Sequence, residues 1–320
     1  MKSINFLNIS RLIILTYVLL FIIYPIAYFI IYVVSPKNIS EVVSFLTSEL
    51  FITSLENSLY VSAITVILTF LIAMPFANFL QRYKIPFKKI IIPLTFIPTM
   101  IPPFVGALSF IFLLGRFGTI NLLLLNAGLI ERPINFIYGI HGIILIQTIV
   151  LFPWMAINIY NNLLKIDRTL EEVAESLGAK PLRRFFTITL PTITPGVITG
   201  FFLVFSFSFT DYATPIVLGR YDLLAPQAFL NIQQAINESR VRMGTYMVFI
   251  MLLIVVAIFL AAKKYISLKE YASLRLPRPV EEIELKKLRK IAVYIFIYLV
   301  LIISLLPHAF IFIISLSKAW

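Results

Sequence analysis

Long apolar runs separated by short polar segments dominate the pattern of this chain. A helix needs about 20 mostly apolar residues to cross a bilayer. Prolines lie inside or near the ends of several runs, which membrane helices tolerate because neighbouring groups satisfy the freed carbonyls. The pattern predicts an all-α polytopic membrane protein with about seven transmembrane helices, at roughly 12–34, 58–80, 90–114, 139–160, 194–218, 243–262 and 291–316.

The composition agrees with this class. Hydrophobic residues make up 60% of the chain and charged residues only 13%, which is too little charge for a water-facing surface. The first apolar run is longer than the apolar core of a signal peptide and lacks a cleavage site, so we expect it to be retained. There is no cysteine, and His141 and His308 lie far apart without carboxylate neighbours. We therefore expect neither disulfides nor a metal site.

The positive charges are placed as orientation signals. If the N-terminus is cytoplasmic, 20 of the 27 Lys and Arg residues fall in inner segments and 7 in outer ones, as the positive-inside rule requires. The net charge of +12 is therefore explained without nucleic acid, and no basic patch interleaved with aromatic residues supports such a partner.

The polar segment 171–191 interrupts the apolar runs and lies on the predicted cytoplasmic side. Thr169 and Glu172 have the spacing of a capping box, which predicts a helix that begins at Leu170. Gly178 is suited to end that helix in a left-handed conformation, and Pro181 to begin a second short segment. The first helix would carry an apolar stripe of Leu170, Val173, Ala174 and Leu177.

An amphipathic helix of this kind has two interpretations. It can lie on the inner membrane surface, with Glu172 acting only as a cap. It can also place its apolar stripe in a groove of a soluble partner. The physical pattern alone leaves both open.

The spacing within this segment resembles the EAA loop of ABC-importer permeases. Six residues match that pattern, and Val173 replaces its first alanine: Glu172, Ala174, Gly178, Ile188, Leu190 and Pro191. The resemblance implies the fold of a type I ABC importer permease and a coupling helix that fits a cleft on a cytoplasmic ATPase subunit. It implies that the coupling residues are Glu172, Val173, Ala174, Leu177, Gly178, Ile188, Leu190 and Pro191.

The likeness covers about Asn57 to Lys264. It divides the chain into an N-terminal helix with an outer loop (1–56), a permease core of five transmembrane helices (57–264), a basic cytoplasmic linker (265–290) and a further helix (291–320). The segment from Thr210 to Leu230 resembles permeases of the iron(III) and aminophosphonate type. Those chains are usually double-length with two EAA loops, whereas this chain has one.

The first and last runs resemble each other. YPIAYFIIYVVS around Pro25 and LPHAFIFIISLS around Pro307 align at Pro, Ala, an aromatic residue and the final Ser. Chance can produce such a match in apolar helices. The alternative is that the last run begins a second permease half, since internal duplication is common in transporters.

Asp211 is the acidic residue closest to the interior of a predicted span. Ionisable groups at membrane depth usually face a cavity or a partner, so Asp211, Tyr212 and Thr214 are candidates for the outer mouth of a substrate path. The alternative is that Asp211 only anchors the helix end at the membrane interface.

These observations predict the transmembrane subunit of a binding-protein-dependent ABC importer in the cell membrane, without cofactors or covalent chemistry of its own. None of the 11 glycines begins a phosphate loop, so ATP hydrolysis would belong to a partner. Expected partners are ATPase subunits, an extracytoplasmic binding protein, a second permease half or homodimer mate, and lipid. Iron(III) is the suggested substrate, with thiamine, polyamines, aminophosphonate and sulfate open. An ion-coupled secondary transporter would need more intramembrane charge, and a membrane enzyme would need a polar cluster that the sequence lacks.

Overall fold

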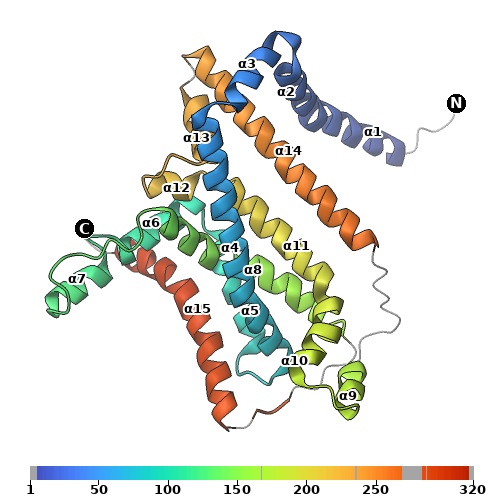
Figure 1. The fold of residues 1–320 in the computed structure, drawn as a ribbon, viewed down its shortest axis with the longest axis vertical. Helices are drawn as coiled ribbons and strands as arrows, with labels where there is room; N and C mark the ends of the chain where they lie inside the picture. The colour runs from blue at the N-terminus through green and yellow to red at the C-terminus, as the bar shows by residue number, and fades with distance from the viewer. Residues whose placement is uncertain (1–5, 167, 235, 269–282, 286, 317–320) are drawn as a thin grey trace.

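The computed structural model describes residues 6–166, 168–234, 236–268, 283–285 and 287–316. Helices form almost all of this part of the chain (Figure 1). In chain order they are α1 (Phe6–Val18), η1 (Leu19–Ile23), α2 (Tyr24–Val34), α3 (Pro36–Leu46), α4 (Glu49–Arg82), α5 (Lys88–Met100), α6 (Pro103–Leu114), α7 (Thr119–Asn126), α8 (Ile140–Leu163), α9 (Arg168–Ser176), α10 (Pro181–Arg184), η2 (Phe185–Thr189), α11 (Leu190–Phe209), α12 (Ala213–Val217), α13 (Leu224–Gln233), α14 (Glu238–Leu268) and α15 (Lys287–Ser315).

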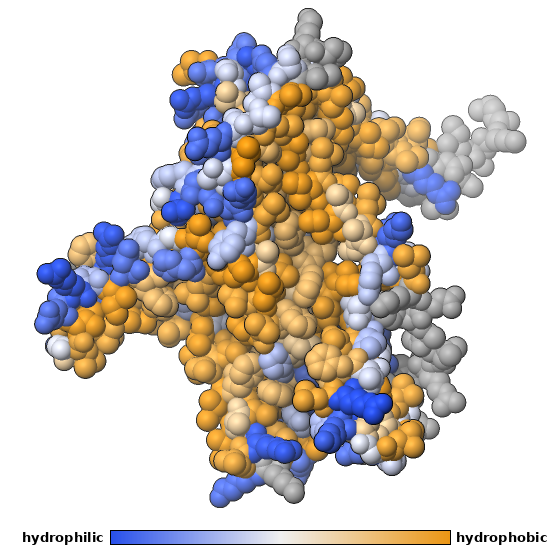
Figure 2. Space-filling model, in the orientation of Figure 1, coloured by the Kyte–Doolittle hydropathy of each residue, from blue (hydrophilic) through white to orange (hydrophobic). Residues whose placement is uncertain are grey.

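The predicted all-α membrane architecture is confirmed. Within the described residues, seven helical stretches are long and apolar enough to cross a membrane. Figure 2 shows hydrophobic side chains over most of the visible face, with hydrophilic ones gathered mainly toward its margins. Because lipid is as apolar as these side chains, their exposure is the expected condition of a membrane-spanning surface.

Helices α4, α8 and α11 pack together at the centre of the bundle (Figure 1). Their shared core includes Phe76, Phe152 and Val204, each at most 2% exposed. Small residues bring α11 close to α8: a Cβ built on Gly196 would lie 2.4 Å from the carbonyl oxygen of Asn158. Glycine is the one residue type that avoids this clash.

The predicted helix 90–114 is interrupted. Helix α5 ends at Met100 and α6 begins at Pro103, with Ile101 in an extended conformation. Two consecutive prolines, Pro102 and Pro103, cannot donate backbone hydrogen bonds, and each restricts the residue before it to extended geometry. The prediction of one continuous span was therefore wrong at this point.

The predicted span 194–218 is also wrong in its bounds. The helical path begins earlier, at Pro181, and α11 ends at Phe209. Asp211 explains this end, because its carboxylate accepts hydrogen bonds from the backbone N–H groups of Ala213 and Thr214. Such a side chain competes with helical hydrogen bonding and starts α12 as a separate turn.

The first and last spans differ in their surroundings. Helix α15 packs against α5 and α6, and its Pro307 and His308 are buried. The span Ile9–Val34 leaves its most apolar window entirely unburied. The linker residues 269–282 and Ser317, which entered the predicted domain division and repeat, lie outside the described residues.

The predicted inner segments converge on one side of the bundle. Arg82 pairs with Glu171, and Lys84 Nζ lies 3.4 Å from Glu284 Oε1. On the opposite side, Asn57 donates to Asp222 at 3.0 Å, and Arg242 Nε lies 3.0 Å from Glu41 Oε2. The alternation of helices thus separates the two sets of loops as the charge pattern predicts.

Candidate docking helix and membrane cavity

Helix α9 begins at Arg168, two residues earlier than predicted. Thr169 therefore lies inside the first turn, and the capping box stays a prediction. The end of the helix agrees with expectation, since Gly178 has a φ of +81°. The N–H of Ala179 donates to the carbonyl of Ala174 at 2.9 Å, and the N–H of Gly178 to that of Glu175 at 2.8 Å. These two bonds form a Schellman motif, which fixes where the helix stops.

The apolar stripe of α9 faces away from the rest of the chain. Leu170, Val173 and Leu177 expose 57%, 58% and 83% of their surface. Leu182 and Phe186 in the second short segment are also exposed. Large apolar side chains on a polar, loop-side helix typically mark an interaction surface.

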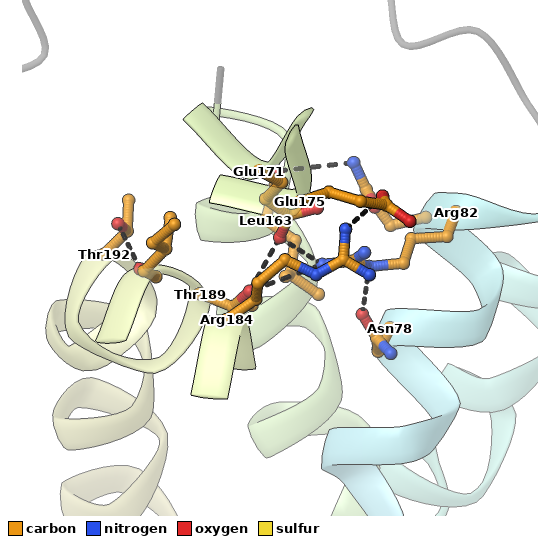
Figure 3. A network of polar contacts seen from close by, with 10 residues as sticks. Asn78, Arg82, Leu163, Glu171, Glu175, Arg184, Thr189 and Thr192 are labelled. Carbon is orange, nitrogen blue, oxygen red and sulfur yellow. Dashed lines mark hydrogen bonds and ion pairs between the residues drawn. The ribbon is translucent and has the colours of Figure 1, made fainter. Parts of the chain in front are cut away.

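A polar network holds α9 against the membrane helices (Figure 3). Arg82, at the end of α4, forms an ion pair with Glu171, and its Nε donates to Asn78 Oδ1 at 2.7 Å. The hydroxyl of Thr189, which is 1% exposed, donates to Glu171 Oε1 at 2.7 Å. Arg184 pairs with Glu175 one turn further along α9. The charged face of α9 is thus attached while its apolar stripe stays exposed.

The environment of Glu171 is unlike that of an ordinary surface carboxylate. Burial alone would raise its pKa, but the hydrogen bond from Thr189 and the guanidinium of Arg82 outweigh this, so that the pKa lies below its usual value of 4.5. The carboxylate is therefore held as an anion by its partners.

The structure separates the predicted coupling residues into two groups. Glu172, Val173, Leu177 and Gly178 are exposed on α9 or at its end. Ile188 lies in η2, and Leu190 packs against the core of the bundle. Ala174 is half-buried and Pro191 exposed. Ile188 and Leu190 are thus partly buried outside the exposed stripe of α9.

Sequence reasoning missed Glu171 and Arg82. The sequence indicates for Glu171 only a favourable place near the start of the helix, where carboxylates are common because of the helix dipole. Its partner lies 89 residues away in the chain, so local spacing gives no sign of the pair. The one available signal is an arginine at the last position of an apolar span that also has an acidic residue in a nearby loop on the same side.

Asp211, Tyr212 and Thr214 all line one cavity of about 500 Å³ between α6, α8 and α11–α12. The break between α5 and α6 contributes Ile101 and Pro102 to the wall. Both interrupted spans therefore meet at the same place. Irregular backbone at membrane depth is tolerated where it lines a cavity.

Gln147 of α8 holds Asp211 in this wall. Its Nε2 donates to Asp211 Oδ2 at 3.0 Å, and its Oε1 accepts from Ser208 Oγ at 2.7 Å. Gln147 and Ser208 are buried. The Asp211 carboxylate is therefore held from two elements at the cavity wall.

An exposed amphipathic helix on one side and a cavity lined by interrupted helices inside the bundle are typical of a polytopic membrane protein of the transporter class. The family model for binding-protein-dependent transport system inner membrane components matches residues 71–267. The chain belongs to this family, and it is a multi-pass protein of the inner membrane.

The relatives of this chain are named for different substrates. The spermidine/putrescine permease PotB of Haemophilus influenzae is 30% identical over 46% of this chain and 52% of its own length. The ferric permease FbpB of Actinobacillus pleuropneumoniae is 27% identical over 72% of this chain and 34% of its own. The molybdenum permease ModB of Mycobacterium bovis is 29% identical over 51% of this chain and 60% of its own length. The chain thus spans between a third and three fifths of the length of these relatives.

Solved structures confirm the fold. A chain of a bacterial ABC transporter for alginate import superposes with a TM-score of 0.64 at 18% identity, covering 82% of this chain and 96% of that one. A chain of the MetNI methionine ABC transporter superposes with a TM-score of 0.51 at 17% identity, covering 69% of this chain and 99% of that one. The type I importer permease architecture expected from the EAA loop is therefore present.

Proposed function

We propose that this chain forms half of the substrate path of a binding-protein-dependent ABC importer and transmits ATP-driven motion through α9. The observation that carries the proposal is the exposed apolar stripe of α9, which sits on a helix fixed to the bundle by the Arg82–Glu171 ion pair. A helix that touched only lipid would need no such attachment.

The docking partner in this proposal is an ATP-binding cassette subunit. Leu177 and Val173 would enter its cleft, and the abrupt end at Gly178 would leave room for the cleft wall. Glu172 is exposed beside them and would contact the polar rim. Closure of two such ATPase subunits would move α9, and the network in Figure 3 would pass that movement to α4 and α11.

The path itself requires a second permease unit, either a further half or a second copy of this chain. An extracytoplasmic binding protein would deliver substrate to the loops around α7 and α13. The similarity between the first and last spans supports a duplicated arrangement, in which α15 would be the first helix of another half. The cavity lined by Asp211, Tyr212 and Thr214 would be this chain's contribution to the path.

Iron(III) is one candidate substrate, as the segment Thr210 to Leu230 suggests, and ferric permeases align with 72% of this chain. Permeases named for polyamines and molybdenum align with about half of it. The named relatives support several chemistries, so the lining of the cavity becomes the better guide.

The docking role is tested by co-purification of the cognate ATPase with single variants. Leu177→Glu places a charge in the proposed contact, and Gly178→Arg adds bulk at a positive-φ position. Burying a leucine contributes about 1.5–3 kcal/mol, so we expect ATPase affinity to fall about 10- to 100-fold.

Matched controls exist on the opposite side of the molecule. Gly128 also has a positive φ, +69°, with no atom within 4 Å of a built Cβ, and the neighbouring Leu129 is 71% exposed. Gly128→Arg and Leu129→Glu should leave association unchanged. Intact association in the α9 variants would refute the docking assignment.

A further inference from the structure

We propose that the cavity beside Asp211 binds a substrate through an organic ammonium group. This inference rests on the proposed role of the cavity in the substrate path, and it specifies the chemical class that the cavity accepts. It follows from the charge and the aromatic character of the wall, considered together.

Among the described residues that line the cavity, Asp211 is the single charged side chain, and lysine, arginine and histidine are absent. An oxyanion would meet a carboxylate here without any basic group to balance it. Two backbone N–H groups that could have bound an anion, those of Ala213 and Thr214, already donate to Asp211 Oδ1. The wall is therefore suited to a positive charge.

The carboxylate is oriented and still able to accept a bond. Oδ1 accepts from two N–H groups, and within the described part of the chain Oδ2 accepts from Gln147 alone, at 3.0 Å. Each carboxylate oxygen can accept two hydrogen bonds, so Oδ2 retains acceptor capacity. An ammonium group is a compact donor that can use it.

Aromatic rings surround the same space. Trp154, Tyr212, Phe207 and Phe104 belong to the wall. The Trp154 ring is fixed by Phe96 at 5.8 Å and Phe207 at 5.4 Å between ring centroids. Tyr212 stacks on Phe229 at 4.5 Å. Indole and phenol faces attract cations, and they also accept the methylene groups of an aliphatic amine.

A bare metal cation fits less well. Hard ions need several oxygen ligands at once, and Asp211 provides the one carboxylate among the described residues of the wall. Within the described part of the chain, no group of three or more His, Cys, Asp or Glu side chains could hold a metal ion. The cavity therefore favours an amine over iron(III).

Trp154 makes the test direct, because the chain contains two tryptophans. In a Trp320→Phe background, Trp154 alone reports on the cavity. The protein is placed in phosphatidylcholine nanodiscs and titrated with putrescine, spermidine, sodium molybdate and gallium(III), which replaces iron(III) without quenching fluorescence. We expect saturable emission changes with the two amines and none with molybdate or gallium.

Asp211→Asn should weaken amine binding by roughly tenfold or more, since it removes the charge of a charge-assisted hydrogen bond. Asparagine also caps helices well, so α12 should persist. Asp222→Asn is the control, because Asp222 lies on the same side of the bundle but outside the cavity wall. Its amine affinity should match that of the parent.

Several outcomes would overturn the proposal: a response to molybdate or gallium but not to amines, equal binding by Asp211→Asn, or no response to any probe. The comparison of amines with molybdate and gallium is made in the protein that keeps Asp211. Misfolding of Asp211→Asn therefore cannot mask the result. Failure of the proposed importer role would appear separately, as α9 variants that keep their association with the ATPase, which this titration does not measure.

Discussion

Breaking the ion pair between Arg82 and Glu171 should loosen α9 while the membrane helices stay folded. The side chains of the pair are 25% and 12% exposed, which places it between surface pairs, worth about 0–1 kcal/mol, and fully buried pairs, whose disruption costs about 3–5 kcal/mol. We expect Glu171→Gln to destabilise the attachment of α9 by about 1.5 kcal/mol. Arg82→Met should cost somewhat more, because it leaves the partly buried carboxylate without the guanidinium that compensates its charge.

Hydrogen–deuterium exchange of the α9 backbone amides measures this attachment. A loss of about 1.4 kcal/mol corresponds to roughly tenfold faster opening. Exchange in α8 and α11 should be unchanged. The double variant should lose less than the sum of the single losses, with a coupling energy of about 1 kcal/mol, because both single changes remove the same interaction.

The exposed pair Lys84–Glu284 is the matched control. Its side chains are 69% and 81% exposed, and Nζ and Oε1 lie 3.4 Å apart. Glu284→Gln should therefore change local exchange less than about twofold. Additive losses in the Arg82/Glu171 cycle, or an equal effect in the control, would refute the assignment of the pair as the attachment of α9.

Three further predictions concern other parts of the chain. Because the pKa of Glu171 is lowered, its contribution to holding α9 is present above pH 4.5 and is lost as the pH falls below that value through the lowered pKa. A fluorophore on Ser176→Cys, in a chain without native cysteine, should report this transition, and Glu171→Gln should remove it. Gly196→Ala should destabilise the bundle by about 1–3 kcal/mol, because its Cβ would lie 2.4 Å from the carbonyl oxygen of Asn158, whereas Gly106→Ala, whose Cβ would have its nearest neighbour at 3.7 Å, should be tolerated. Thermal unfolding in detergent compares the two variants, and equal stabilities would contradict the close packing. Asn121→Ala should lower the stability of the fold by about 1–3 kcal/mol, because the buried side-chain amide donates to the carbonyls of Gly115 and Ile134 and accepts from the N–H of Ile134. Substitution of the exposed Asn126 by alanine is the control in the same assay, and an unaltered melting temperature for both variants would count against this role.

The sequence predicted the spans well and their interruptions poorly. Apolar length is a local property, so seven helices could be recognised from the chain alone. The break at Ile101–Pro102 was missed because single prolines kink membrane helices without ending them, and the effect of two in a row depends on what surrounds them. Asp211 was recognised as unusual, but its helix-ending hydrogen bonds are visible only in three dimensions.

In the segment around α9, too, features set by nearby residues could be predicted, and contacts between distant residues could not. Gly178 and the exposed stripe follow from residues close together in sequence, and both were predicted. The attachment of α9 depends on Arg82 and Thr189, which lie 89 and 18 residues from Glu171. Helical spacing carries no information about such pairs. The predicted roles of Glu172, Val173, Leu177 and Gly178 in ATPase contact stay predictions until the docking variants are measured.

Arg82 also takes part in a second contact through its backbone. Its carbonyl accepts from the N–H of Ile283 at 3.0 Å, and the N–H of Lys84 donates to the carbonyl of Ile283 at 3.3 Å. These main-chain bonds tie the segment that leads into α15 to the end of α4, independently of side-chain identity. One residue therefore joins α9 through its guanidinium and the approach to α15 through its carbonyl. A displacement of α9 that rotates Arg82 would therefore also disturb the segment that leads into α15.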